Sequence, residues 1–187
     1  MLNYNSSLIK ENSYSELSMK AINPIMKFII RGRKREFLSG VGKTLNMILP
    51  TEPCTSSSNN DTTAIWLSPD EWMVFSNNVV NKDINSYELE NLLVNTISKA
   101  NLGAITDVTD QYVLINIKGK KIFDLLSLGC PFNFNDFRNK KGSVIQSLIA
   151  KIDIIVHLKE IDNINLLVRR SYSEHLYSFL CDAASRI

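Results

Sequence analysis

The chain has 187 residues, of which 44% are hydrophobic and 21% are charged, and this composition is typical of an ordinary globular protein. Its 21 basic and 19 acidic residues leave a formal net charge of +2. Such a balance excludes the strong positive field that recruits nucleic acid or an anionic membrane, so we expect neither as a partner. The length suits one compact domain or two small fused ones.

Three cysteines, Cys54, Cys130 and Cys181, stand far apart in the sequence and form no CxxC pair. Their odd number favours free thiols in a reducing compartment over a disulfide framework. The sequence shows neither a signal-peptide pattern nor a run of about 18 apolar residues. We therefore expect a cytoplasmic protein that does not span a membrane.

Residues 1–23 are rich in Ser, Asn and charged residues and have no long apolar stripe. This composition predicts a flexible N-terminal arm. We expect residues 24–187 to form a single compact α+β domain.

Residues 27–32 predict a short strand, and the following segment predicts a helix that Pro50 ends. The apolar stripe of this helix consists of Phe37, Leu38, Val41, Leu45 and Ile48. Residues 51–63 are a Ser/Thr/Asn/Pro cluster without periodicity, which predicts a surface loop.

Residues 64–67 and 72–76 predict two strands joined by the tight turn Ser68-Pro69-Asp70-Glu71. Ser86 then stands where an N-cap is expected, before a helix that Gly103 follows. The apolar positions of that helix are Leu89, Leu92, Leu93, Ile97 and Ala100.

Residues 106–131 contain the clearest local signals of the chain. Residues 112–117 are β-branched and aromatic and predict a buried strand, after which Gly119 turns the chain into a helix. We expect Gly129 to end this helix in a left-handed conformation, and Pro131 prevents its continuation.

Residues 143–150, 152–159 and 164–169 predict three more strands, and residues 173–185 predict a last helix. A shift of 87 residues places Gly32 on Gly119 and Leu38 on Leu125, and it also superposes the late helices. The shift indicates an internal repeat, with halves at about 24–108 and 109–187, each of the ferredoxin-like βαββαβ type. Chance similarity between the halves is the alternative.

The order and spacing of several motifs resemble the gamma subunit family of heterotetrameric sarcosine oxidase. The motifs are WLSPDEWMVF (residues 66–75), the V-T-D that precedes the strand at 112, Gly129-Cys130-Pro131, and LLVRRSYSEHLYSFLCDAA (residues 166–184). The resemblance covers about residues 27–185. It implies a fold related to the folate-binding region of the glycine-cleavage T-protein.

The resemblance also implies an accessory subunit of a complex that oxidatively demethylates sarcosine to glycine and passes the one-carbon unit to tetrahydrofolate. The partners would be the alpha, beta and delta subunits. FAD, FMN, NAD and tetrahydrofolate would be held by those subunits, and no cofactor by this chain.

The residues themselves indicate no catalytic or metal centre, because catalytic groups have to converge in pairs or triads. His157 stands alone in an apolar strand and His175 begins the last helix without a second ligand at helical spacing. Gly40-Val41-Gly42-Lys43-Thr44 resembles the end of a phosphate-binding loop but lacks its first glycine and lies within a helical pattern. The basic run Arg31, Arg33, Lys34 and Arg35 is typical of a solvated turn, with an acidic partner surface as the alternative.

We therefore expect the hairpin to carry a partner interface, formed by Trp66, Pro69, Asp70, Glu71 and Trp72. Aromatic residues anchor many interfaces, but they also pack cores, so at least one of the two tryptophans is expected to be buried. Two alternatives remain open: a small folate-dependent one-carbon transferase that uses Asp107, Asp110 and Tyr112, and a stand-alone folate-binding module.

Overall fold

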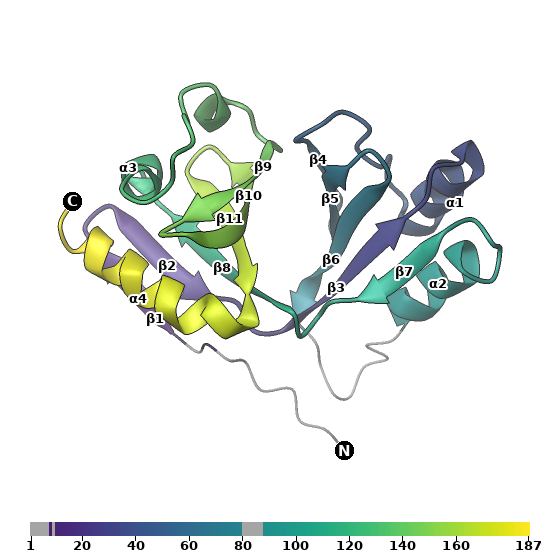
Figure 1. The fold of residues 1–187 in the computed structure, drawn as a ribbon, viewed down its shortest axis with the longest axis horizontal. Helices are drawn as coiled ribbons and strands as arrows, with labels where there is room; N and C mark the ends of the chain where they lie inside the picture. The colour runs from purple at the N-terminus through teal and green to yellow at the C-terminus, as the bar shows by residue number, and fades with distance from the viewer. Residues whose placement is uncertain (1–7, 9, 80–87) are drawn as a thin grey trace, which may run out of the picture. The chain divides into compact units, whose positions relative to one another are not determined.

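A computed structural model describes residue 8, residues 10–79 and residues 88–187. The chain divides into two compact units: unit 1 consists of residues 1–24 and 110–187, and unit 2 of residues 25–109. Each unit contains one antiparallel sheet with helices packed on it (Figure 1). The predicted α+β class is confirmed. The sequence predicted halves at about 24–108 and 109–187, and in the structure the described residues up to 24 lie with residues 110–187 in unit 1.

Unit 2 has a five-stranded sheet in the order β4-β5-β6-β3-β7. Its elements are β3 (Ile25–Arg31), α1 (Arg35–Leu45), β4 (Ser56–Ser58), β5 (Thr62–Ser68), β6 (Glu71–Val79), α2 (Glu88–Ile97) and β7 (Ala104–Asp107). When the short edge strand β4 is left out, the order of the elements is that of the predicted βαββαβ unit.

The apolar stripe of α1 decides how unit 2 packs. Phe37, Val41 and Leu45 are buried at the helical spacing of four residues and face the core. Gly40 lies inside this helix, where an added Cβ would stand 3.2 Å from Thr96 of α2. The glycine therefore serves close helix packing, and the phosphate-loop resemblance has no strand-to-helix loop to support it.

Unit 1 has a six-stranded sheet in the order β1-β2-β8-β11-β10-β9. Its elements are β1 (Glu11–Tyr14), β2 (Leu17–Ala21), β8 (Tyr112–Lys118), α3 (Ile122–Ser127), the 3-10 turn η1 (Phe137–Asn139), β9 (Val144–Ile149), β10 (Ile152–Glu160), β11 (Asn163–Arg169), the 3-10 turn η2 (Arg170–Tyr172) and α4 (Ser173–Ala184). Its core joins one face of this sheet to α3, α4 and the phenylalanines around η1.

The N-terminal segment differs from the predicted flexible arm. Residues 11–21 form β1 and β2, and β2 pairs with β8 in the register Met19 to Ile117. Leu17, Met19 and Ala21 are buried. The alternation of buried and exposed residues in β2 is only five residues long, too short to predict a strand from this polar segment. The strand forms because it pairs with a partner about one hundred positions away. Residues 1–7 and 9 of the predicted arm lie outside the described residues.

Two glycines have different roles from each other. Gly119 has φ +128°, and a Cβ there would stand 2.0 Å from the carbonyl oxygen of Glu16, so only glycine fits the turn against the β1–β2 connection. Gly129 was expected to have a left-handed conformation with positive φ. In the described residues the glycines with positive φ are Gly119 and Gly142, so the expectation for Gly129 is wrong. Gly129 instead allows close packing, since a Cβ there would lie 3.0 Å from the ring of Phe179.

The two units repeat one strand order. β3 (Ile25–Arg31) shifted by 87 residues coincides with β8 (Tyr112–Lys118), and α2 shifted by the same amount falls within α4. In both sheets the repeated strands follow one order, with β4, β5, β6 and β3 matching β9, β10, β11 and β8. The place of β7 beside β3 is taken in unit 1 by β2 beside β8.

Several local expectations need correction. The predicted loop at 51–63 contains β4 and the start of β5. The last strand of the predicted βαββαβ unit had no assigned residues, and the structure places it at β7. Ile48, placed in the apolar stripe of α1, lies beyond the end of that helix and is 86% exposed. The predicted N-cap Ser86 lies outside the described residues.

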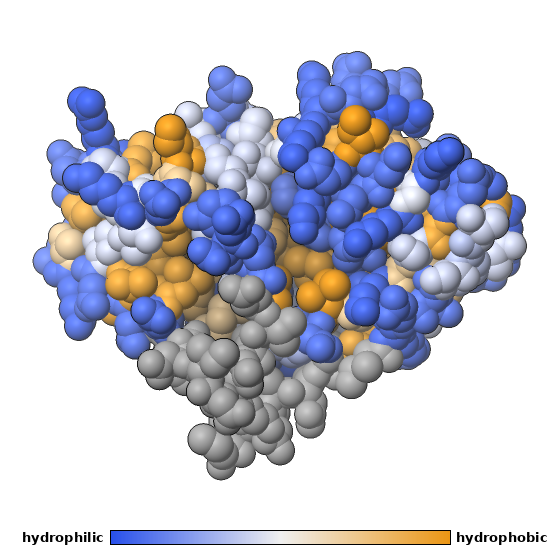
Figure 2. Space-filling model, turned by 180° about the vertical axis from the view of Figure 1, so that it is seen from behind, coloured by the Kyte–Doolittle hydropathy of each residue, from blue (hydrophilic) through white to orange (hydrophobic). Residues whose placement is uncertain are grey.

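Some large apolar side chains remain exposed on the surface. Figure 2 shows hydrophobic patches set among hydrophilic residues. The exposed large hydrophobic residues of the described part of the chain are Ile48, Leu92, Leu128, Phe132, Leu148, Ile161 and Tyr172. Phe132 is the most exposed member of a cluster of phenylalanine rings, 5.2 Å from Phe134 and 5.9 Å from Phe137 between centroids. Such patches are typical of surfaces that contact other proteins.

The position of β2 predicts that Met19→Ala destabilises the protein by roughly 2–5 kcal/mol, because a fully buried side chain leaves a cavity in the core of unit 1. Denaturant unfolding of the full chain measures this change. Lys20→Ala is the matched control: the Lys20 side chain is exposed and pairs with Glu11 at the surface, so its loss costs less than about 1 kcal/mol. Equal, small effects of both substitutions would contradict the role given to β2.

Candidate functional site

The hairpin of β5 and β6 has the predicted form. Trp66 pairs with Trp72 across the two strands, and the chain turns at Pro69-Asp70. Pro69 is exposed, whereas Asp70 and Glu71 are half-buried. The turn of the hairpin is therefore exposed to solvent, and its two strands are part of the sheet of unit 2.

Asp70 is held by its own unit. Its carboxylate accepts hydrogen bonds from Arg33 Nε at 3.0 Å and from Ser68 Oγ at 3.2 Å, and Arg31 Nη2 lies 3.4 Å away. The hydrogen bond from Arg33 lowers the pKa of the Asp70 carboxyl, against a smaller opposing effect of desolvation. The predicted interface contains both Asp70 and Glu71. Asp70 is already paired within unit 2, so Glu71 is the acidic residue of the hairpin without an ion pair in the described part of the chain. The same ion pairs neutralise part of the basic run at 31–35.

The two tryptophans have different environments. Trp72 is 2% exposed, packs against Phe37 with ring centroids 5.7 Å apart, and donates from Nε1 to the carbonyl oxygen of Pro50 at 2.7 Å. Trp66 is half-buried against the same core. The expectation that at least one tryptophan is buried is confirmed. Trp66 is the one with surface left for a partner.

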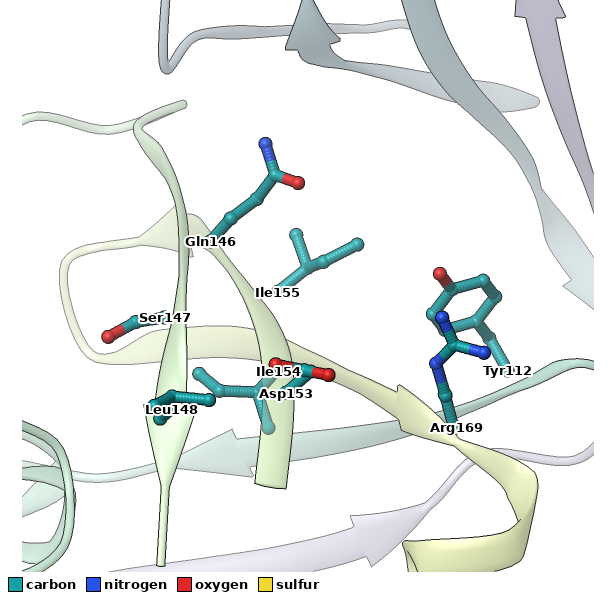
Figure 3. A pocket seen from close by; sticks show the side chains of 8 residues that line it. All are labelled: Tyr112, Gln146, Ser147, Leu148, Asp153, Ile154, Ile155 and Arg169. Carbon is teal, nitrogen blue, oxygen red and sulfur yellow. The ribbon is translucent and has the colours of Figure 1, made fainter. Parts of the chain in front are cut away.

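A pocket that the sequence did not reveal lies on the sheet of unit 1. Its volume is about 520 Å³. The lining residues come from four neighbouring strands and are Tyr112, Gln146, Ser147, Leu148, Asp153, Ile154, Ile155 and Arg169 (Figure 3). The lining combines apolar side chains with polar and charged ones, the usual composition of a ligand site. Arg169 also lines a second, more open cavity with Gln111, Arg170 and Ser171.

Alternation along the strands explains why this pocket has polar walls. Val113, Ile115 and Ile117 of β8 enter the core of unit 1, so Tyr112, Leu114 and Asn116 face the other side of the sheet. Farther along the same face, Asn116 Nδ2 donates to Asn165 Oδ1 at 3.0 Å and to Asn163 Oδ1 at 2.7 Å. On this second face, the buried Leu114 and Leu167 separate the pocket residues Tyr112 and Arg169 from the asparagines.

Buried titratable groups serve structure in both units. His157 lies in β10 opposite Asn165 and is 2% exposed, as expected of a sheet residue. Burial, with a smaller effect of Lys159, lowers the pKa of His157 to about 4, so the ring is neutral at pH 7. In unit 2, the buried Lys27 Nζ donates to the carbonyl oxygens of Ile25 at 2.9 Å and Thr109 at 3.2 Å.

The remaining chemical groups are dispersed. The three cysteines are free, as expected, and the buried Cys130 Sγ lies 3.4 Å from Ser147 Oγ. Among the described residues, no group of three or more His, Cys, Asp or Glu side chains is placed to hold a metal ion. None of the helices in the same part of the chain is long and apolar enough to cross a membrane.

Comparison with known proteins decides the family. Residues 33–186 match the family model described as "Sarcosine oxidase, gamma subunit family". The chain belongs to the sarcosine oxidase gamma subunit family. No curated protein matches the chain.

Two solved structures have a fold similar to that of this chain. A chain of the heterotetrameric sarcosine oxidase from Corynebacterium sp. U-96, in complex with pyrrole 2-carboxylate, is 17% identical, with a TM-score of 0.81 over 94% of this chain and 88% of that chain. The glycine cleavage system aminomethyltransferase T from Bartonella henselae is 15% identical, with a TM-score of 0.62 over 88% of this chain and 45% of that chain. The predicted similarity to the T-protein fold is confirmed.

The residues considered for folate binding in this gamma-family chain have other partners. Asp110 pairs with Arg170 at 2.9 Å, and Asp107 accepts a hydrogen bond from the backbone N–H of Thr109 at 2.8 Å. Tyr112 lines the pocket. The pocket residues Asp153 and Arg169 were missed in the sequence, since Asp153 is the second residue of β10 and Arg169 the last residue of β11, and both strands have ordinary sequences. The available signal was a charged residue at an alternating position of an otherwise apolar strand.

The neutral state of His157 predicts that stability falls as the pH is lowered from about 6.5 to about 4. In that window the unfolded chain takes up a proton that the folded chain does not, so the pKa difference corresponds to a loss of roughly 3 kcal/mol. Denaturant unfolding over this pH range measures it. His157→Gln should remove this part of the pH dependence, whereas His175→Gln, at an exposed position, should keep it. Identical profiles for native chain and His157→Gln would contradict the assignment.

Proposed function

We propose that this chain is an accessory gamma subunit of a heterotetrameric sarcosine oxidase. The observation that carries the proposal is the family match, which spans residues 33–186 and therefore most of both units. The similar fold of a chain in a heterotetrameric sarcosine oxidase supports it. The complex would oxidatively demethylate sarcosine to glycine and transfer the one-carbon unit to tetrahydrofolate.

In this proposal the chemistry belongs to the alpha, beta and delta subunits, which would hold FAD, FMN, NAD and tetrahydrofolate. This chain would contribute contact surface. The exposed apolar side chains and the ordered hairpin are suited to that role, because few well-placed side chains carry most of the affinity of an interface. The three free thiols agree with the expected cytoplasmic location.

The hairpin remains our candidate for the contact with a large subunit, with the roles of its residues revised. Asp70 fixes the turn through Ser68 and Arg33, so the turn has its shape before binding and costs less ordering. Pro69, Glu71 and the exposed part of Trp66 are then the residues that a partner meets. Trp72 supports them from the core.

Co-expression with the alpha, beta and delta subunits tests the proposal. We expect the chain to co-purify with them in one complex, with flavin absorbance in that complex and none in the chain purified alone. Flavin bound to the isolated chain would contradict the accessory role. Elution of the chain apart from the three subunits would contradict membership in the complex.

Glu71→Lys tests the hairpin. Reversing this charge should lower the yield of co-purified complex, since electrostatic complementarity governs association. The melting temperature of the free chain should fall only slightly, because Arg31, the cross-strand neighbour of Glu71, is exposed and already paired with Asp70. Asp70 is left intact, because its replacement by Lys would bring a third cation to Arg31 and Arg33.

Glu52→Lys is the matched control, since Glu52 is an exposed acidic residue of the same unit outside the hairpin. Undiminished assembly of Glu71→Lys would place the interface elsewhere. Equal loss with Glu52→Lys would indicate a general charge effect.

A further inference from the structure

One row of side chains crosses the pocket of unit 1, with one member from each of four neighbouring strands (Figure 3). Leu148 of β9 pairs with Asp153 of β10, and Arg169 of β11 pairs with Tyr112 of β8. The register of β10 against β11 places Asp153 beside Arg169. Leu148, Asp153, Arg169 and Tyr112 therefore follow one another across the second face of the sheet, and we call them the pocket row.

The two charged members of the pocket row have no ion pair within the part of the chain that the structure describes. Both side chains are exposed, and although they stand on adjacent strands they do not pair with each other. The next residue, Arg170, differs, because its Nη1 lies 2.9 Å from Asp110 Oδ1. The row thus offers one cation and one anion, side by side, to a group from outside.

The uncharged members of the row favour contact with another protein. Leu148 is 40% exposed, and Tyr112 is half-buried next to the position of Arg169. Tyrosine and arginine are enriched among the few residues that carry most of the affinity of an interface. The exposed leucine adds apolar surface that a partner would remove from water.

The shape of the pocket restricts what can cover the row. The hollow has a volume of about 520 Å³, so a protruding segment is needed to fill it. A two-fold contact with a second copy of this chain would place one hollow against another and leave the charges apart. A free ion at such exposed side chains would stay hydrated, whereas a protein segment covers the whole row and excludes water from the charges.

We propose that the pocket row is a docking site for a protruding segment of one of the other subunits, with an acidic side chain on Arg169 and a basic side chain on Asp153. A guanidinium binds a carboxylate through two parallel hydrogen bonds, and the carboxylate of Asp153 accepts hydrogen bonds from a cation. The order of the two charges fixes the direction of the segment, because the reversed segment would meet like charges.

The inference rests on the proposed function, since it assigns a surface by which this subunit would join the complex. It is separate from the hairpin of unit 2, because every member of the pocket row belongs to unit 1. The two surfaces can therefore be tested one at a time.

Competition for assembly tests the charges of the row. The native chain and one variant, carrying tags of different mass, are co-expressed with the alpha, beta and delta subunits, and mass spectrometry of the purified complex gives their ratio. Arg169→Gln and Asp153→Asn should each be incorporated at least about 10-fold less than the native chain, because each leaves a charge of the partner unpaired. Both positions are exposed, so the melting temperature of the free chain should change little.

Lys159→Gln and Asp162→Asn are the matched controls, since both residues are exposed, belong to unit 1 and lie outside the pocket. They should be incorporated as well as the native chain. Equal incorporation of Arg169→Gln and the native chain would overturn the docking site and leave the subunit proposal intact. Absence of the native chain from the complex would overturn both.

The double variant Asp153→Arg/Arg169→Asp distinguishes a segment of another subunit from a second copy of this chain. Both charges are reversed, so a segment of fixed direction is repelled twice and the variant should be excluded from the complex. In a two-fold contact between copies the exchanged charges would still meet. We expect the free native chain to sediment as a monomer. A dimer that each single variant breaks and the double variant restores would overturn the proposal.

Maleimide labelling locates the contact without changing a charge. Leu148→Cys should react several-fold more slowly in the complex than in the free chain, because the docked segment covers this side chain. Ile161→Cys is the matched control, since Ile161 is 60% exposed in the same unit and lies outside the pocket, and its labelling rate should not change. Peptide mapping separates these sites from the three native cysteines. Unprotected Leu148→Cys in an assembled complex, or equal protection of both positions, would overturn the assignment.

Discussion

The pairing of β2 with β8 is the contact on which unit 1 depends. β8 has two paired edges, one with β11 and one with β2, and the second partner comes from the start of the chain. Gly119 at the end of β8 lies directly against the carbonyl of Glu16, so the turn after β8 and the turn before β2 fit only together. The N-terminal segment also receives the phenol of Tyr177, which donates to the Met19 carbonyl at 3.1 Å. Sheet, turn and last helix are thereby tied to one short strand.

In unit 2 the corresponding edge of the sheet is paired with a strand from the same continuous stretch of chain. β7 pairs with β3 in the place that β2 occupies beside β8, and the two sheets otherwise follow the same strand order. A repeat with one exchanged strand explains why the second unit is continuous in sequence while the first is assembled from both ends of the chain. The family match begins at residue 33 and omits β2, although unit 1 requires that strand.

Charge in this chain is arranged locally rather than as a global field. In unit 2, Arg31 and Arg33 form ion pairs with Asp70. These pairs stabilise the shape of the hairpin turn and reduce the free positive charge of the basic run. In unit 1 Asp153 and Arg169 remain open on the second face of the sheet, a few positions from a row of hydrogen-bonded asparagines. A chain with these features offers both a preformed turn and a polar pocket, each supported by a sheet.

Short-range patterns in the sequence were enough to predict several local elements and the family. β8, α4 and the β5–β6 hairpin have their signals within windows of about ten residues, where periodicity and turn chemistry suffice. The tertiary structure decided the rest: the membership of residues 11–21 in a sheet, the ion pairs of Asp70, and the approach of Asp153 to Arg169. Each of these depends on strand pairing between residues far apart in the chain, and such pairing is set by packing in the folded protein. Gly129 shows the same limit, because its need for a small residue comes from Phe179 of α4 and not from the end of its own helix.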